Sequence, residues 1–147
     1  MRALPSAALL LLAACGDATS PAARPSTPAA VAAALPGTYT LRAIDGAAPP
    51  QVVLVAAGDT VTLAGATLAF ASDGSYRARA TVRHSAAPSA SVDEVSAGTW
   101  TVSDSGIAVS ATSGVLTGAT TLALGGDGAL TVDDTLNGRR VRLTFRQ

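Results

Sequence analysis

Apolar and polar residues alternate with a period of two through most of the chain after residue 37. The clearest run is SYRARATVR (75–83), where Tyr76 and Val82 share one phase and the arginines share the other. The last segment, RRVRLTFRQ (139–147), repeats the pattern up to Phe145. Successive side chains of a strand point to opposite faces, so this alternation predicts antiparallel strands with one buried face and one solvated face.

Turn residues separate these segments. The dipeptides that favour tight hairpin turns are Asp45-Gly46, Asp73-Gly74, Asp127-Gly128 and Asn137-Gly138. One phase slip occurs in TVTLAGATLAF (60–70), and it predicts a bulge or tight turn near Gly65. No ten-residue stretch with helical periodicity follows residue 37.

The pattern yields roughly eight to ten strands, an estimate that fits an up-and-down barrel or a two-sheet sandwich. A sandwich needs long connections between its sheets, and only residues 84–94 and 110–119 are long enough. We therefore expect an all-β domain over residues 37–147, an antiparallel meander closed into a barrel, with the β-sandwich as the alternative.

The amino-terminal residues have the features of an export signal. Arg2 makes the start positive, and an uncharged apolar run covers residues 7–14. That run is too short to span a bilayer as a helix, so residues 1–14 are expected to be a signal peptide. Leu-Ala-Ala before Cys15, the only cysteine, resembles the bacterial lipobox.

The lipobox resemblance implies that the Cys15 thiol is acylated with diacylglycerol and that Cys15 becomes the first mature residue. The expected location is the bacterial cell envelope, anchored to a membrane by lipid. Gly16, rather than an aspartate, follows the cysteine, which favours the outer membrane, at its periplasmic face or on the cell surface. Several acyl chains together give stable attachment, whereas one chain binds only marginally.

Residues 16–36 contain four prolines among alanine, serine and threonine. Such a segment offers little apolar surface to bury, so residues 15–36 are expected to form a lipidated cysteine followed by a disordered tether. Its AAVAAAL stretch is long enough for a helical turn or two.

The order of the segments LPGTYTLRAIDGAAPP, GATLAFASDGSYRARATV, AGTWTVSDSGIAVS and RRVRLTFRQ resembles the small lipocalin-like (calycin-type) domains of bacterial lipoproteins. Gly37-Thr38-Tyr39 stands where lipocalins open their first strand with Gly-x-Trp. The resemblance implies a barrel, a site for an apolar ligand and no catalysis. It also implies that Arg142 or Arg146 lies across Tyr39.

Five aromatic residues share the apolar phase of their strands. They are Tyr39, Phe70, Tyr76, Trp100 and Phe145. They are either the packed core or the lining of a ligand cavity. The small residues Ala43, Ala78 and Ala80 are assigned to the same inward phase, where they either leave room inside or let the barrel flatten.

All ten basic residues are arginines, and ten acidic residues balance them. This near-neutral charge excludes an electrostatic case for binding nucleic acid. Arginines on the polar phase predict a basic stripe for anionic lipid headgroups or an acidic partner: Arg42, Arg77, Arg79, Arg140 and Arg142. The alternatives are a solvated barrel exterior or, with the phases inverted, a polar lumen.

Catalytic motifs are missing from the sequence. His84 is the single histidine, in a loop-like context, and no metal motif or Gly-x-Ser-x-Gly elbow is present. We expect no enzyme, no metal and no cofactor. Two functions remain: a lipid-anchored envelope protein that binds a small apolar or amphiphilic ligand, or an envelope interaction module with a filled core, whose protein partner the sequence does not identify.

Overall fold

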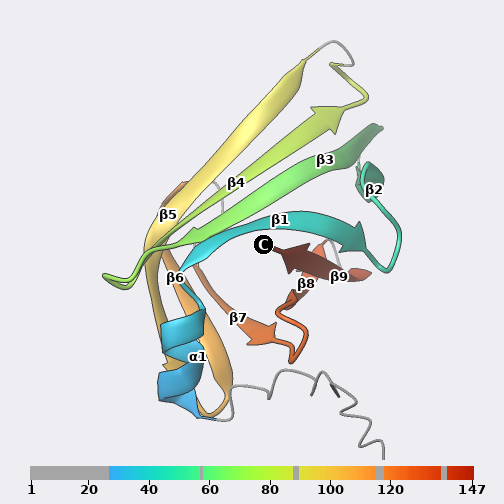
Figure 1. Ribbon diagram of the computed structural model, residues 1–147. Helices are drawn as coiled ribbons and strands as arrows, with labels where there is room; N and C mark the ends of the chain where they lie inside the picture. Colours follow the sequence, from blue (N-terminus) through green and yellow to red (C-terminus); the bar gives the residue numbers. More distant parts are fainter. Residues whose placement is uncertain (1–26, 57, 88–89, 115–117, 137–138) are drawn as a thin grey trace, which may run out of the picture.

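A computed structural model describes residues 27–147 except 57, 88–89, 115–117 and 137–138 (Figure 1). One short helix precedes a series of strands. The elements are α1 Pro28–Ala34, β1 Gly37–Ile44, β2 Gln51–Ala56, β3 Asp59–Phe70, β4 Ser75–His84, β5 Ser91–Ser103, β6 Gly106–Gly114, β7 Gly118–Leu124, β8 Leu130–Leu136 and β9 Arg139–Arg146. Cys15 and the expected signal peptide lie outside the described residues.

The strands form one antiparallel sheet that closes on itself. Its order is β1-β9-β8-β7-β6-β5-β4-β3-β2, and β1 also pairs with β3. Eight strands therefore complete a ring, in which β1 joins β9 on one side and β3 on the other. The expected all-β antiparallel barrel is confirmed, and the sheet is not split into the two layers of a sandwich.

β2 lies outside this ring. It pairs with residues 59–63 of β3, whereas β1 pairs with residues 67–70 of the same strand. β3, β4 and β5 consequently run beyond the closed part, toward the top of Figure 1. We call β2 together with residues 59–64, 80–84 and 91–95 the extension.

The described turns and one bulge agree with the sequence prediction, and Asn137-Gly138 lies outside the described residues. Asp73-Gly74 and Asp127-Gly128 connect β3 to β4 and β7 to β8, with φ of +84° at Gly74 and +75° at Gly128. The register of β3 against β4 shifts between Leu63 and Gly65, which confirms the expected irregularity.

A second bulge overturns one expectation. The register of β1 against β9 shifts between Leu41 and Ala43, so Ile44 lies opposite Leu143 and Ala43 lies opposite Thr144. The expected inward position of Ala43 is wrong, because the extra residue reverses the alternation and brings Ile44, 3% exposed, into the core.

The inward phase of the strands forms one contiguous core. Its buried members are Leu35, Tyr39, Leu41, Ile44, Val53, Leu63, Phe70, Tyr76, Val82, Ile107, Val109, Leu122, Leu130, Val132, Val141 and Phe145. Burial of each large apolar side chain contributes about 1.5–3 kcal/mol relative to leaving it in water.

The helix belongs to the barrel rather than to the tether. Thr27 caps α1 by accepting a hydrogen bond from the backbone of Ala30, and Pro28 begins the helix. Leu35, directly after α1, is completely buried, and its carbonyl accepts a hydrogen bond from the Tyr39 hydroxyl at 3.1 Å. Residues 28–36 thus differ from the expected disorder because one leucine anchors an otherwise alanine-rich segment. No helix among the described residues is long and apolar enough to cross a membrane.

Candidate functional site

Four of the five candidate ligand-lining aromatics pack on one another. The ring of Phe70 lies 5.9 Å from Tyr39 and 6.2 Å from Trp100, both edge-on, and 6.3 Å from Tyr76, stacked. Such offset and edge-on pairs add about 0.5–1.5 kcal/mol each beyond burial. Phe145 is also buried, and it lies opposite Leu41 and Leu130. The aromatic residues predicted to line a ligand cavity therefore contact mainly one another.

The polar atoms of two of these rings already have partners. The Trp100 Nε1 donates a hydrogen bond to the Ala71 carbonyl at 3.0 Å, and the Tyr39 hydroxyl donates to Leu35. Burial raises the pKa of Tyr39, against a smaller opposite effect from a hydrogen bond with Gln147, and burial also raises the pKa of Tyr76. This arrangement is typical of a packed core, in which ring polar groups are satisfied internally.

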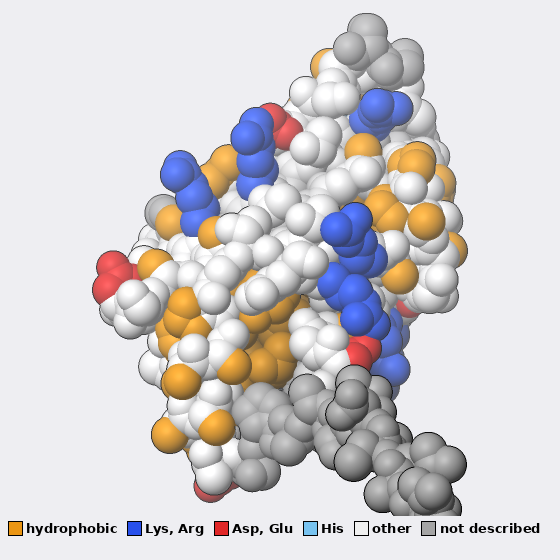
Figure 2. Space-filling view, viewed as in Figure 1, with side chains coloured by type: hydrophobic (Ala, Val, Ile, Leu, Met, Phe, Trp, Pro, Cys, Tyr) orange, Lys and Arg blue, Asp and Glu red, His pale blue; other side chains and the backbone are white. Residues whose placement is uncertain are grey.

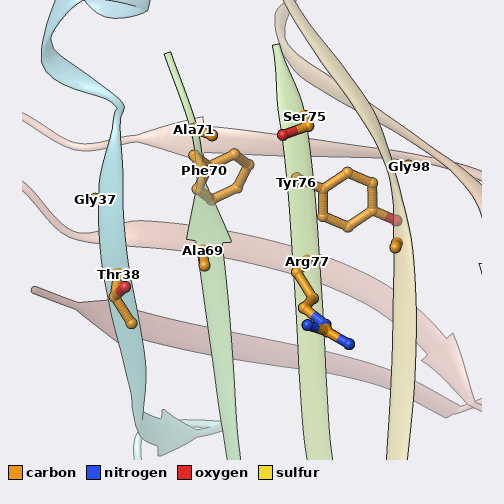
Figure 3. A pocket seen from close by; sticks show the side chains of 10 residues that line it. Gly37, Thr38, Ala69, Phe70, Ala71, Ser75, Tyr76, Arg77 and Gly98 are labelled. Carbon is orange, nitrogen blue, oxygen red and sulfur yellow. The ribbon is translucent and has the colours of Figure 1, made fainter. Parts of the chain in front are cut away.

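An open depression of about 450 Å³ lies in the barrel wall where β1 begins and β3 ends (Figure 3). Four strands contribute to it. Its lining consists of Gly37, Thr38, Ala69, Phe70, Ala71, Ser75, Tyr76, Arg77, Ala97 and Gly98.

The strand register explains how Arg77 comes to stand in this depression. Ala69 and Ala97 lie directly opposite Arg77 on the two neighbouring strands, and Thr38 lies opposite Ala69. Side chains opposite one another in antiparallel strands point to the same face. Arg77 is exposed and is flanked by side chains too short to cover it.

Gly98 is required where β5 and β6 approach each other. A Cβ at this position would lie 1.9 Å from the Ser110 carbonyl oxygen, closer than any side chain tolerates. The register of β5 against β6 shifts at this point, between Ala97 and Gly98. The close approach fixes this strand pair beside the depression.

Acidic neighbours hold several arginines of the outer wall. Arg142 binds Asp133 through two hydrogen bonds, Nε to Oδ1 at 2.7 Å and Nη2 to Oδ2 at 2.9 Å. Further ion pairs join Arg79 to Asp93, Arg139 to Asp45 and Arg146 to Asp127. The hydrogen bond from Arg142 holds the pKa of Asp133 below its usual range, and the one from Arg79 does the same for Asp93.

The predicted basic stripe is therefore divided. Of its five members, Arg79 and Arg142 are ion-paired, whereas Arg42, Arg77 and Arg140 form no ion pair within the described part of the chain. Figure 2 shows the basic side chains of one face as separate groups with other surface between them. The outer wall is thus mixed in charge rather than uniformly basic.

The contact that the lipocalin resemblance implies over Tyr39 is replaced by other interactions. Arg142 and Arg146 bind Asp133 and Asp127, and both guanidinium groups are substantially exposed. The ring of Tyr39 is 1% exposed and packs inside against Phe70. Arg142 therefore links β9 to β8, Arg146 links β9 to the turn between β7 and β8, and neither covers the first aromatic.

His84 has a structural partner that the sequence did not indicate. Its Nδ1 lies 2.7 Å from Oδ2 of Asp59, and Oδ1 of Asp59 accepts hydrogen bonds from Ser85 Oγ and the Ala86 backbone, both at 3.1 Å. The bond with His84 is the largest cause that lowers the pKa of Asp59 from 3.8 to about 2. We call Asp59, His84 and Ser85 the extension latch, because they join the start of β3 to the end of β4.

The latch has the residue types of a catalytic triad without its geometry. Ser85 Oγ donates to Asp59 and accepts from the Thr60 backbone at 2.8 Å, whereas the serine of such a triad donates to the imidazole. Within the described ranges, no group of three or more His, Cys, Asp or Glu side chains is placed to hold a metal ion.

Comparisons with family models, with curated proteins and with solved structures found no match for this chain. The chemistry of the barrel wall therefore carries the functional interpretation.

Proposed function

We propose that the protein is a lipid-anchored module of the bacterial envelope, with a filled barrel core, that binds an acidic partner through its outer wall. One observation carries this proposal: Arg77 stands in the wall depression with no acidic partner among the described residues. Its neighbour Arg79, two residues along β4, is held by Asp93. The proposal assigns no catalytic residue, metal or cofactor.

The chemistry of Arg77 supports an acidic group as the target. A guanidinium presents its donors in a fixed fork that matches a carboxylate with two parallel hydrogen bonds. The short side chains of Ala69 and Ala97, opposite Arg77 on the two neighbouring strands, leave that fork open to an approaching surface. Arginine is also enriched in protein interfaces, where it contributes to binding more often than lysine does.

Charge reversal tests this surface. Arg77→Glu should reduce recovery of a partner at least tenfold when the tagged full-length protein is captured from detergent-solubilised envelopes. The matched control is Arg83→Glu, which lies on the same strand and the same outer phase and is likewise without an ion pair in the described chain. Equal loss in both variants, or loss in neither, would contradict a role for the depression.

Arg142→Glu is not a suitable partner for this test. Its side chain binds Asp133, so an acid there would place two carboxylates together on β8 and β9. The change would disturb strand pairing before it reported on binding.

Lipid anchoring at Cys15 has a separate test. Cys15→Ala should abolish metabolic labelling with a radioactive fatty acid, whereas Ser20→Ala, in the following segment, should leave it unchanged. Labelling that survives in the cysteine variant would refute the anchor without bearing on Arg77.

Small side chains on two strands favour a second candidate, a barrel that binds an apolar or amphiphilic ligand. Ala80 lies opposite Ala66, and Ala78 lies opposite Leu68, all partly buried against the core. Native mass spectrometry of the full-length protein extracted from its own envelope would detect such a ligand. A bound lipid or pigment that is lost in Ala80→Leu would support this candidate, and a bare protein mass would contradict it.

A further inference from the structure

The extension leaves two strand edges without a partner in the described chain. β2 pairs with β3 alone. On the opposite side, β5 pairs with β6 only from Ser96 onward, so the described neighbours of residues 91–95 lie on β4 alone. Unpaired backbone N–H and C=O groups make such edges templates for another strand.

The exposed large hydrophobic side chains among the described residues lie on these two edge segments. Val52 and Val55 of β2 are 44% and 66% exposed, and Val92 and Val95 of β5 are 45% and 36% exposed. Figure 2 shows hydrophobic side chains gathered over the region of β2. Each edge thus combines apolar side chains with backbone groups that have no strand partner among the described residues.

Charge distinguishes the two edges. The β5 segment SVDEV carries Asp93 and Glu94, which are the kind of charged residues that protect an edge from pairing. The β2 segment QVVLVA has no charge and no proline. Two β5 edges would bring like charges together, whereas two β2 edges would not.

We propose that β2 pairs antiparallel with β2 of a second copy of this chain, and so forms a two-fold symmetric dimer. The bulge of β2 between Val52 and Leu54 leaves Val52 and Val55 on the same phase, opposite Thr62 and Thr60 of β3. In one register, Val52 of each copy lies opposite Val55 of the other copy. This register has two-fold symmetry, because exchanging the two copies leaves the same residue pairs. It brings two apolar pairs together on one face of a continuous sheet.

Two-fold pairing also limits the assembly to two copies. The same surface is used by both copies, so no β2 edge remains for a third. Pairing of β2 with the β5 edge of another copy would instead leave free edges at both ends and grow into a chain. The acidic residues of β5 disfavour that route.

The first test is the oligomeric state of the detergent-extracted full-length protein by analytical ultracentrifugation. The wild type should dissociate from dimer to monomer on dilution. Val55→Lys should weaken the dimer at least tenfold, whereas Val95→Lys, the matched exposed valine on the other edge, should leave it unchanged. Near-ultraviolet circular dichroism would establish that both variants keep the native packing of Trp100.

The second test reports the register. Chains carrying Val52→Cys and chains carrying Val55→Cys, with different tags, are expressed together and oxidised in the intact envelope. Opposed residues of an antiparallel pair are about 4.5–5.5 Å apart, within disulfide reach, so the two tags should be cross-linked. Val52→Cys alone should not cross-link, and the wild type, whose lone cysteine is Cys15, serves as the blank.

Several outcomes would overturn the proposal. These are a wild type that is monomeric at every concentration, equal loss of the dimer in Val55→Lys and Val95→Lys, or assemblies larger than two copies. A β2 edge occupied by a different protein, with the chain itself remaining monomeric, would also overturn it. The result for Arg77→Glu is independent of all of these, since Arg77 lies outside the extension.

Discussion

The closed barrel and the extension use the same strands in opposite ways. In the barrel, β1 joins β9 and β3, so every strand of the ring has a neighbour on both sides. In the extension, β3 and β4 continue with β2 and the start of β5 as outer strands, and each of these has one described neighbour. Closure removes edges from one end of the molecule and leaves them at the other.

The side chains follow the same division. All five aromatic residues lie in the closed part, where Phe70 contacts three of the others. The extension is packed by aliphatic residues, with Val53, Leu63 and Val82 as its buried members. We infer that the closed part supplies most of the stability, and that the extension can present a surface because it contributes less.

The largest expected effect separates the two regions directly. Phe70→Ala should lower the free energy of unfolding by about 3–5 kcal/mol, because it removes the ring that Tyr39, Tyr76 and Trp100 share. Leu63→Ala in the extension should cost about 2 kcal/mol, at the low end for a buried leucine. Urea unfolding followed by Trp100 fluorescence measures both, and equal losses would contradict the division.

A pair of glycines gives the next largest effect. Gly98→Ala should lower the free energy of unfolding by about 2–3 kcal/mol, since the added Cβ meets the backbone of Ser110, which is paired in β6 with both β5 and β7. Gly65, at the β3 bulge, has open space around an added Cβ, so Gly65→Ala should change stability by about 0.5 kcal/mol or less. Thermal unfolding of the two variants distinguishes them, and similar midpoints would show that the close approach of β5 and β6 is not a constraint.

The smallest effect lies in the extension latch. The pKa of Asp59 is lowered to about 2 in the folded protein. The ionised carboxylate therefore stabilises the folded state at pH values above the unfolded-state pKa of 3.8, and this stabilisation is lost as the pH falls through 2. Asp59→Asn removes this dependence, so the variant should approach or overtake the wild type as the pH is lowered from 4 to 2.

Thermal unfolding across that pH range measures the difference, and hydrogen exchange at β2 and the end of β4 locates it. Asp104→Asn is the control, at an exposed carboxyl in the turn after β5. A wild type and an Asp59→Asn variant with parallel pH profiles would contradict the latch.

The alternation of apolar and polar residues was sufficient to predict the strands, and the short connections between them favoured closure into a barrel over a sandwich. It also located the β3 bulge, since the slip around Gly65 separates clearly apolar positions from polar ones. The β1 bulge was not predictable, because Ala43 and Ile44 are both apolar and either fits the inward phase. β2 lies outside the ring because it pairs with the first residues of β3, whereas β1 pairs with the last ones. The alternation does not show how one strand is divided between two partners, because that division depends on tertiary pairing.

The candidate site was predicted only in part. Sequence placed Arg77 and Arg142 on the same polar phase, yet one is without an ion pair in the described chain and the other binds Asp133. The difference depends on whether the strand register places an acidic residue opposite the arginine. His84 and Asp59 are 25 positions apart, so their contact arises from the hairpin geometry of β3 and β4 rather than from a local motif.

The helix before the barrel also sets where the domain is attached if Cys15 is anchored. α1 lies at the end of the barrel away from the extension, and the chain enters it at Thr27 (Figure 1). Thr27 is twelve positions after Cys15, so the start of α1 can lie at most about 40 Å from the anchor. Because the chain enters at the closed end, an anchor at Cys15 would leave the β2 edge, at the other end of the molecule, accessible to neighbouring copies anchored in the same membrane.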